Sequence, residues 1–292
     1  MRPAEHRTAR TILITGATGG IGLAAAKALA ALGENVAIVG RDAMRTRIAA
    51  AETRAAARKG AMVSTHVADL SSQAAVRKLA AEIRDNHPRL DVLVNNAGAM
   101  YTRRRTSADG IELTWALNHL APFLLSALLL DRLEASAPAR IVTTASAAHQ
   151  GARIPFDDLD AEQSYGGFVR YKQSKLANIL FTGELARRLQ GRGVSAYCFH
   201  PGLVDSGFNR NNGLLMSVAM TLLGPVARSA DKGAQTLVWL AGAPEAELTN
   251  GGYYVDMALR SPSPEGRNIE SARRLWEISE AQCAGQREVE GG

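Results

Sequence analysis

The chain of 292 residues contains little cysteine and no long apolar run. Its two cysteines, Cys198 and Cys283, can form neither a disulfide framework nor a four-ligand zinc site, and a reducing cytosol is the simplest compartment. The most apolar stretch, residues 120–133, reaches about half of the roughly 20 residues that span a bilayer. The polar N-terminus, MRPAEHRTAR, lacks the apolar segment of a signal peptide. We therefore expect a cytoplasmic protein with no membrane anchor and no metal site.

Aromatic residues are also scarce, at 5% of the sequence, and they are not interleaved with the scattered arginines. This pattern argues against a nucleic-acid partner, although 34 basic and 28 acidic residues give a net charge of +6. Lysine is rare as well, since 28 of the 34 basic residues are arginine. The excess of positive charge fits a compositional bias as well as it fits a phosphorylated cofactor, so it identifies no partner.

Short runs rich in β-branched residues alternate with longer segments in which apolar residues have helical spacing. The expected strands cover residues 11–15, 35–39, 62–67, 90–94, 140–145, 193–199 and 251–255. Helices are expected near 21–32, 43–59, 72–86, 112–136, 168–190 and 230–241. This alternation predicts an α/β fold with a doubly wound, Rossmann-type parallel sheet of about seven strands and helices on both faces.

No break in composition is long enough to be a linker, so we expect a single dinucleotide-binding catalytic domain over residues 11–258. Residues 1–10 would form an N-terminal extension and residues 259–292 a C-terminal extension. Within the domain, residues 203–230 are predicted to form an irregular, partly helical and strongly apolar insertion.

A glycine-rich turn, in TGATGGIG, follows the first expected strand and opens an alanine-rich helix. Gly16, Gly20 and Gly22 let the backbone turn tightly and approach a pyrophosphate at the N-terminus of that helix. The spacing is G-x-x-x-G-x-G rather than that of the usual dinucleotide fingerprint. A tight turn between a strand and a helix is the alternative, but the place of this turn after the first strand favours cofactor binding.

The end of the second strand, in VAIVGRD, bears on which cofactor is bound. Enzymes that prefer NAD place an acidic residue there, whereas this chain has Arg41, whose guanidinium suits a 2′-phosphate. The sequence therefore favours NADP(H) over NAD(H), and a solvent-facing arginine is the alternative. Asp42 is expected to cap the following helix.

Two later strand ends also carry candidate cofactor contacts. Asp69 and Leu70 follow the third strand and could flank an adenine ring, while Ser71 or Ser72 could equally cap a helix. After the fourth strand, residues 95–98 (NNAG) suit a cleft wall, because ligands bind outside the carboxyl ends of such strands.

The segments TGATGGIG, NNAG, YKQSK and HPGLV, with Ser146 after the fifth strand, resemble the short-chain dehydrogenase/reductase family in order and spacing. The resemblance spans roughly residues 11–258. Further stretches, among them ALNHLAPFLL and SPSPEGRNIESARRLWEISE, resemble its retinol dehydrogenase-like branch, which includes microsomal retinal reductases and bacterial relatives. The animal enzymes of that branch usually carry a membrane-anchoring N-terminus, which the polar start of this chain does not resemble.

Tyr171 and Lys175 lie four residues apart and therefore share one face of the expected helix. The spacing alone permits a surface pair. The resemblance makes Tyr171 the general acid/base and Lys175 its partner, which would also bind the nicotinamide ribose. The chemistry agrees, because a nearby cation lowers the pKa of a phenol from about 10 and eases proton exchange near neutrality. Tyr165 has no lysine four residues later and is a candidate pocket residue.

The resemblance assigns further roles to single residues. Ser146 would orient a substrate carbonyl, and Asn118 would distort its helix and hold a water in a proton relay from Lys175. A turn serine and a solvated asparagine are the alternatives. The predicted cofactor contacts are Gly16, Thr18, Gly20, Ile21, Gly22, Arg41, Asp69, Leu70, Asn96, Ala97, Gly98, Tyr171, Lys175, Pro201, Gly202, Val204 and Ser206.

In the family, the stretch that corresponds to residues 203–230 covers the substrate, and an apolar lid there suits a hydrophobic ligand. The sequence thus predicts an NADP(H)-dependent oxidoreductase that interconverts a hydrophobic aldehyde or ketone and its alcohol. A tailoring ketoreductase or dehydrogenase of bacterial secondary metabolism, or a non-redox nucleotide-binding protein on the same fold, are the alternatives. The helices near 112–136 and 168–190 resemble the family's dimerisation surfaces, so a homodimer or homotetramer is expected.

Overall fold

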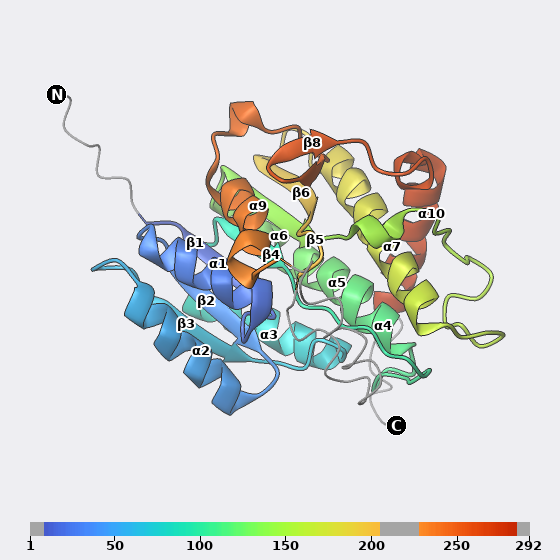
Figure 1. The fold of residues 1–292 in the computed structure, drawn as a ribbon, viewed down its shortest axis with the longest axis horizontal. Coiled ribbons are helices and arrows are strands. Elements are labelled where there is room, and N and C mark those ends of the chain that lie inside the picture. The colour runs from blue at the N-terminus through green and yellow to red at the C-terminus, as the bar shows by residue number, and fades with distance from the viewer. Residues whose placement is uncertain (1–8, 205–227, 285–292) are drawn as a thin grey trace, which may run out of the picture.

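The structure is a computed structural model that describes residues 9–204 and 228–284. Its centre is one sheet in the order β3-β2-β1-β4-β5-β6-β7-β8 (Figure 1). The strands are β1 (Thr11–Thr15), β2 (Asn35–Gly40), β3 (Val63–Val67), β4 (Val92–Asn95), β5 (Ala139–Thr144), β6 (Val194–His200), β7 (Tyr253–Val255) and β8 (Ala258–Arg260). Strands β1 to β7 pair in parallel, and β8 pairs antiparallel to β7. The predicted doubly wound α/β fold is confirmed.

Helices cover both faces of this sheet (Figure 1). One face carries α1 (Gly20–Ala31), α2 (Ala43–Ala56) and α9 (Ala230–Gly242), and the other carries α3 (Gln73–Asn86), α5 (Ala121–Leu128) and α7 (Gly167–Arg188). Successive strand residues point to opposite faces, so Ile12 and Ile14 join the core below α1, whereas Leu13 joins the core below α5 and α7. Both faces of the central strands are therefore buried.

Residues 112–136, predicted as one helix, are divided into short elements. These are α4 (Leu113–Trp115), the π-helical turn η1 (Ala116–Leu120), α5 and α6 (Leu130–Ala135). Pro122 lies in the first turn of α5 and has no N–H to donate to the preceding turn, which explains why the helical geometry changes here. In the part of the chain that the structure describes, no helix has the length and apolarity needed to cross a bilayer.

Strand β8 was not predicted. It pairs with β7 through a two-residue turn in which Asp256 and Met257 have φ of 51° and 60°. Positive φ at both central residues is the usual geometry of such hairpins, but glycine or asparagine normally signals it. Because neither residue is present in this turn, the sequence carried no local hairpin signal.

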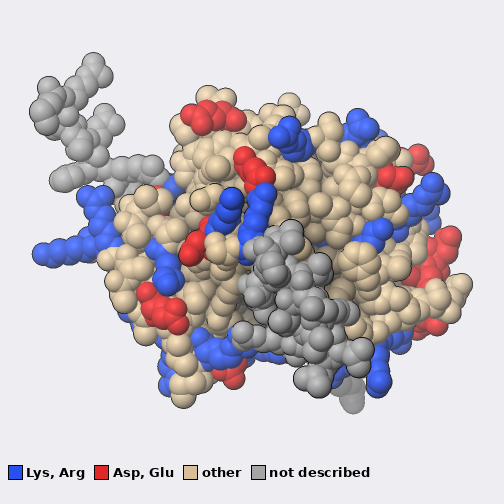
Figure 2. All heavy atoms as spheres, in the orientation of Figure 1, with Lys and Arg blue, Asp and Glu red and all other residues tan. Residues whose placement is uncertain are grey.

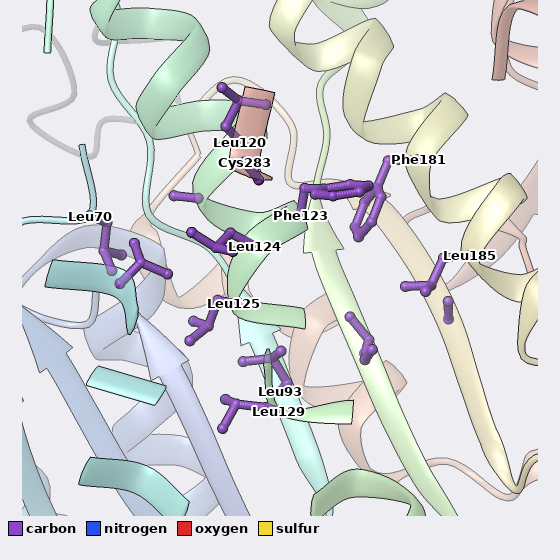
Figure 3. Packing of buried hydrophobic residues seen from close by; sticks show 14 of the residues in the cluster. Leu70, Leu93, Leu120, Phe123, Leu124, Leu125, Leu129, Phe181, Leu185 and Cys283 are labelled. Atoms are coloured by element: carbon purple, nitrogen blue, oxygen red, sulfur yellow. The ribbon is translucent and has the colours of Figure 1, made fainter. Parts of the chain in front are cut away.

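The predicted C-terminal extension contributes α10 (Ile269–Ala284), which packs on the outer side of α7. Trp276 stacks on Phe181 with the ring centroids 6.0 Å apart, and its ring lies edge-on to Phe123 at 4.8 Å. Figure 3 shows Phe123 and Phe181 side by side, in the same apolar cluster as Cys283 of α10. Since α10 thus packs on apolar residues of α5 and α7, the expected homodimer or homotetramer through these helices stays a prediction.

Short 3-10 turns and helix caps complete the described elements. The turns are η2 (Ala147–His149), η4 (Glu245–Glu247) and η5 (Glu265–Arg267). Asp42 is the N-cap of α2 and accepts a hydrogen bond from Arg45 N at 2.8 Å, as predicted. Of the two serines considered as caps after β3, Ser72 is the N-cap of α3.

Candidate active site

The site lies where the strand order reverses, because β1 is flanked by β2 on one side and by β4 on the other. Ligands of doubly wound sheets bind in the crevice outside the carboxyl ends of the strands at this point. A cavity of about 830 Å³ occupies it, lined from the glycine turn at one end to Tyr171 and Lys175 at the other.

The glycine turn is shaped by close backbone contacts. Gly16 has a φ of +67°, and a Cβ on it would lie 2.8 Å from Ala97 Cα. A Cβ on Gly22 would collide with the carbonyl oxygen of Gly16 and would lie 2.7 Å from Asn96 Nδ2. Among the described residues, no side chain caps the N-terminus of α1, so its first N–H groups suit a phosphate. The turn therefore fits the pyrophosphate of a dinucleotide.

Thr15 and Asn96 join this turn to the end of β4. Thr15 Oγ1 accepts hydrogen bonds from Asn96 N at 2.9 Å and Ala97 N at 3.1 Å. Asn96 Nδ2 donates to Thr15 O at 3.0 Å. The expected cleft wall at NNAG is present, but the Asn96 amide holds the glycine turn in place. Sequence reasoning missed Thr15, which a buried threonine at a strand end could have suggested.

Arginine side chains mark the other side of the glycine turn. Arg41 follows Gly40 at the end of β2 and lines the cavity, and so does Arg45 in the first turn of α2. Arg45 was missed, although it lies four residues after Arg41. Burial raises the pKa of Tyr101, while the charge of Arg41 acts in the opposite direction. Two guanidinium groups therefore face the region next to the turn.

Asp69 and Leu70 line the same part of the cavity. Asp69 Oδ1 accepts hydrogen bonds from Ser71 N at 3.0 Å and from Ser71 Oγ at 2.7 Å, which fixes its carboxylate at the end of β3. The placement is compatible with the expected position beside an adenine ring.

Tyr171 and Lys175 lie in the N-terminal half of α7, and the Lys175 Nζ is 5.7 Å from the centroid of the Tyr171 ring. Burial lowers the pKa of Lys175 to about 8, and its Nζ donates to Thr144 O at 2.9 Å. Burial also raises the pKa of Tyr171 to about 12, while a hydrogen bond with the Ser146 side chain acts in the opposite direction. The lowered phenol pKa expected from the lysine is not found in this structure, because desolvation dominates.

Ser146 follows the end of β5 and faces Tyr171. Its Oγ accepts a hydrogen bond from Ala148 N at 3.1 Å, so it caps the short turn η2. A hydroxyl has one proton and two lone pairs, and the cap occupies only one lone pair. The proton and the second lone pair are left for Tyr171 and a substrate oxygen.

Asn118 lies in the π-helical turn, so the predicted helix distortion is present. Its Oδ1 accepts from Ala99 N at 2.8 Å, and its Nδ2 donates to Ala99 O at 2.9 Å and to Ser174 Oγ at 3.0 Å. These bonds connect α7 to the loop after β4. The side chain is fully buried and does not line the cavity. A relay water would therefore have to bind the main chain of this turn rather than the Asn118 amide.

The start of α7 is held by a buried ion pair that sequence reasoning also missed. Arg170, next to Tyr171, pairs its Nε with Glu112 Oε2 at 2.7 Å, and Arg170 Nη2 donates to Leu159 O. Glu112 in turn accepts from Trp115 N at 2.9 Å. Tyr165 donates to Tyr101 O at 2.8 Å and does not line the cavity, so its expected pocket role is not supported.

The mouth of the cavity beside Tyr171 is apolar, with Phe168 60% and Leu203 46% exposed. Pro201, Gly202 and Val204 line it as predicted positions. Ser206 and residues 205–227 of the expected lid lie outside the described residues. Of the other predicted site residues, all but Asn118 and Tyr165 line this one cavity.

A family model for short chain dehydrogenase matches residues 10–214. Retinol dehydrogenase 12 from Homo sapiens is 42% identical over 270 residues, which cover 92% of this chain and 85% of that protein. A Streptomyces sp. (strain C5) protein named "Putative daunorubicin C-13 ketoreductase" is 44% identical over 275 residues, covering 93% and 92%. A solved short chain dehydrogenase from Burkholderia cenocepacia J2315 in complex with NADP has a TM-score of 0.67 and 29% identity, covering 84% and 95%.

The chain belongs to the short-chain dehydrogenase family. The predicted resemblance to its retinol dehydrogenase-like branch is confirmed by these relatives, and the protein is an oxidoreductase. The family fold binds a nicotinamide cofactor, and the glycine turn described above fits one. On the face of this dehydrogenase seen in Figure 2, basic and acidic side chains are interspersed and form no single charged patch. Among the described residues, no group of three or more His, Cys, Asp or Glu could hold a metal ion.

Proposed function

We propose that this dehydrogenase interconverts a hydrophobic aldehyde or ketone and its alcohol with NADP(H), and that Tyr171 is its general acid/base. The observation that carries the proposal is that Tyr171, Lys175 and Ser146 line the same cavity beside its apolar mouth. Phe168 and Leu203 expose apolar surface there, which favours a neutral, hydrophobic substrate.

The proton chemistry follows from the two hydroxyls. A bound nicotinamide supplies the hydride for reduction or accepts it in oxidation. During reduction negative charge grows on the carbonyl oxygen, so Tyr171 transfers its proton there while Ser146 donates a hydrogen bond that orients the oxygen. The raised pKa of about 12 keeps Tyr171 protonated near neutral pH, which is the form that reduction needs. In the oxidative direction the ionised form of the same phenol, which higher pH favours, removes the proton of the alcohol.

The preference for NADP(H) rests on Arg41 and Arg45. Both line the cavity next to the glycine turn, and a guanidinium binds a phosphate with two parallel hydrogen bonds. The NADP complex of the Burkholderia cenocepacia relative supports this choice. Asp42, the acidic side chain nearest in sequence, is engaged as the cap of α2.

A second candidate is a ketoreductase for a large polycyclic ketone. The 44% identical Streptomyces protein is named as a daunorubicin ketoreductase. The cavity of about 830 Å³ must hold the cofactor as well as the substrate, so the size of the ketone is a sharp test of this candidate. Retinal and an anthracycline ketone are therefore the two most informative substrates.

The test is NADPH oxidation with a panel of short aldehydes, long-chain aldehydes, retinal and an anthracycline ketone. We expect turnover to rise with the apolar surface of the carbonyl compound and NADPH to be preferred over NADH. Absence of turnover across the panel by an enzyme that binds NADPH would contradict the proposed function. Turnover of the anthracycline alone would favour the second candidate.

A further inference from the structure

His149 lies directly behind Ser146 and outside the cavity. It is fully buried, and its Nδ1 is 2.6 Å from the carbonyl oxygen of Ser146. On the opposite side of the ring, Nε2 is 3.1 Å from the backbone nitrogen of Ser263, 114 residues away in the sequence. The ring also meets Tyr253 edge to face, with the centroids 5.2 Å apart. Each polar atom of the imidazole thus has one defined partner.

These partners determine the protonation state of the ring. A carbonyl oxygen can only accept a hydrogen bond, so Nδ1 must carry a proton. A backbone N–H can only donate, so Nε2 must be unprotonated. His149 is therefore neutral, in the Nδ1–H tautomer, whenever both hydrogen bonds are present. A second proton would have to enter at Nε2 and would remove the bond to Ser263.

Ser263 is held rigidly in this role. It is 3% exposed and stands between Pro262 and Pro264, which lack an N–H and have restricted φ. Its own Oγ accepts a bond from Gly266 N at 3.2 Å, which ties Ser263 to the turn that follows it. The backbone N–H of Ser263 is thereby directed at the imidazole.

We propose that His149 is a positioning residue for Ser146, held by the Ser263 backbone, so that residues 262–264 of the C-terminal region set the geometry of the active site. The inference rests on the proposed function of Ser146 as the group that orients the substrate carbonyl. His149 does not line the cavity and acts through the main chain of Ser146. Displacing that serine by about 1 Å is expected to lower turnover by about 10- to 100-fold.

The surroundings of His149 keep it neutral. Burial lowers its pKa, while the bond to the Ser146 carbonyl and the charge of Glu265 act in the opposite direction. His200, whose pKa burial lowers to about 4, and Tyr253 are the other titratable groups that face it. Because the pKa of His149 lies below 6.5 in the folded state, its contribution to activity is retained near neutral pH and is lost on acidification.

The first test needs no substrate. A long-range ¹H–¹⁵N spectrum of the full chain, with the His149 signals assigned from the His149→Asn variant, reports which ring nitrogen carries the proton. We expect Nδ1–H at neutral pH. An Nε2–H tautomer or an imidazolium at that pH would overturn the inference. Since the measurement is independent of turnover, it distinguishes failure of this inference from failure of the proposed function.

The second test compares variants by steady-state kinetics and NADPH fluorescence. His149→Asn keeps a donor that can reach the Ser146 carbonyl, whereas His149→Leu keeps none. We expect His149→Leu to lower kcat by about 10- to 100-fold with the NADPH Kd within about twofold, and His149→Asn to recover part of the loss. His66→Asn, which alters another buried histidine that lies away from the cavity, is the matched control for buried substitution. An equal kcat in His149→Leu and the wild type would overturn the positioning role.

Two substitutions at position 263 separate the backbone from the side chain. Ser263→Pro removes the N–H that His149 accepts, whereas Ser263→Ala keeps it and removes only the hydroxyl. We expect Ser263→Pro to lower kcat about tenfold more than Ser263→Ala, and the acid limb of its pH–rate profile to move to higher pH, because His149 then protonates without losing a partner. Equal kcat values and unchanged profiles in two variants with native circular dichroism would contradict the role of Ser263.

Discussion

The two ends of the cavity are built from different parts of the chain. At the cofactor end, backbone contacts between β1, α1 and the loop after β4 set the shape, as the clashes of a Cβ at Gly16 or Gly22 demonstrate. At the catalytic end, buried side chains set it through hydrogen bonds between distant residues, as the Asn96–Thr15 pair also does beside the glycine turn. Asn118 bonds Ser174 across 56 residues, and His149 bonds Ser263 across 114. The cofactor end depends on free space next to the backbone. The catalytic end depends on hydrogen bonds between distant residues, which form only in the folded chain.

At the cofactor end, the largest expected change in NADPH affinity comes from adding one carbon to a glycine. Gly22→Ala forces the glycine turn away from Asn96, and overpacking of this kind costs about 1–3 kcal/mol. We expect the NADPH Kd to rise by about 10- to 100-fold in a fluorescence titration.

The matched control is Gly183→Ala, in the middle of α7, where a Cβ meets nothing within 4 Å. Alanine is the better helix former there, and we expect unfolding to cost up to about 1 kcal/mol more than in the wild type. Tight NADPH binding by Gly22→Ala would show that the turn tolerates a side chain and does not cradle the cofactor.

A change of charge at the same end should alter which cofactor is used. Arg41→Asp replaces the proposed 2′-phosphate ligand by a carboxylate, and hydrogen bonds to charged groups are worth about 1.5–3 kcal/mol. We expect the ratio of kcat/KM for NADPH to that for NADH to fall by about 10- to 100-fold. Arg47→Asp makes the same change in net charge at an exposed position of α2 that does not line the cavity. An unchanged ratio in Arg41→Asp would remove Arg41 from the 2′-phosphate site.

At the catalytic end, burial of Lys175 should appear as a dependence of stability on pH. Its pKa is about 8 in the folded protein and 10.5 for an ordinary lysine, so the unfolded chain binds more protons between these limits. The free energy of unfolding should therefore rise with pH from about 8 to 10, by at most about 1 kcal/mol per pH unit from this group. Urea titrations of the wild type and Lys175→Met should differ in that slope. Parallel slopes would mean that the lysine is not desolvated in the folded protein.

The sequence was most informative where a function depends on local backbone geometry. The TGATGGIG turn lies between a strand and a helix that short-range patterns predict, and Arg41 follows a strand whose start was located correctly. It was less informative where partners come from afar. Nothing local to His149 indicates Ser263, 114 residues away, as its partner, and the Arg170–Glu112 pair joins residues 58 apart. The lowered pKa expected for Tyr171 was wrong because sequence proximity to Lys175 says nothing about burial, which dominates.

Strand β8 and the divided helix at 112–136 show the same limit. The β7–β8 turn contains Asp256 and Met257 rather than glycine or asparagine, so its left-handed backbone could not be foreseen. In the 112–136 segment, helical periodicity continues across Pro122 although the hydrogen bonding changes there. The helix distortion at Asn118 was expected only from the family resemblance.

The most direct test of the account is the Tyr171→Phe variant, measured for both turnover and NADPH affinity. Loss of the phenol removes the proton donor, and general acid catalysis contributes about 10²- to 10⁴-fold. We predict a fall in kcat of at least that order with the NADPH Kd within about threefold of the wild type, because the glycine turn and both arginines are unchanged. Equal kcat in the variant and the wild type would contradict the assignment of Tyr171 as the general acid/base.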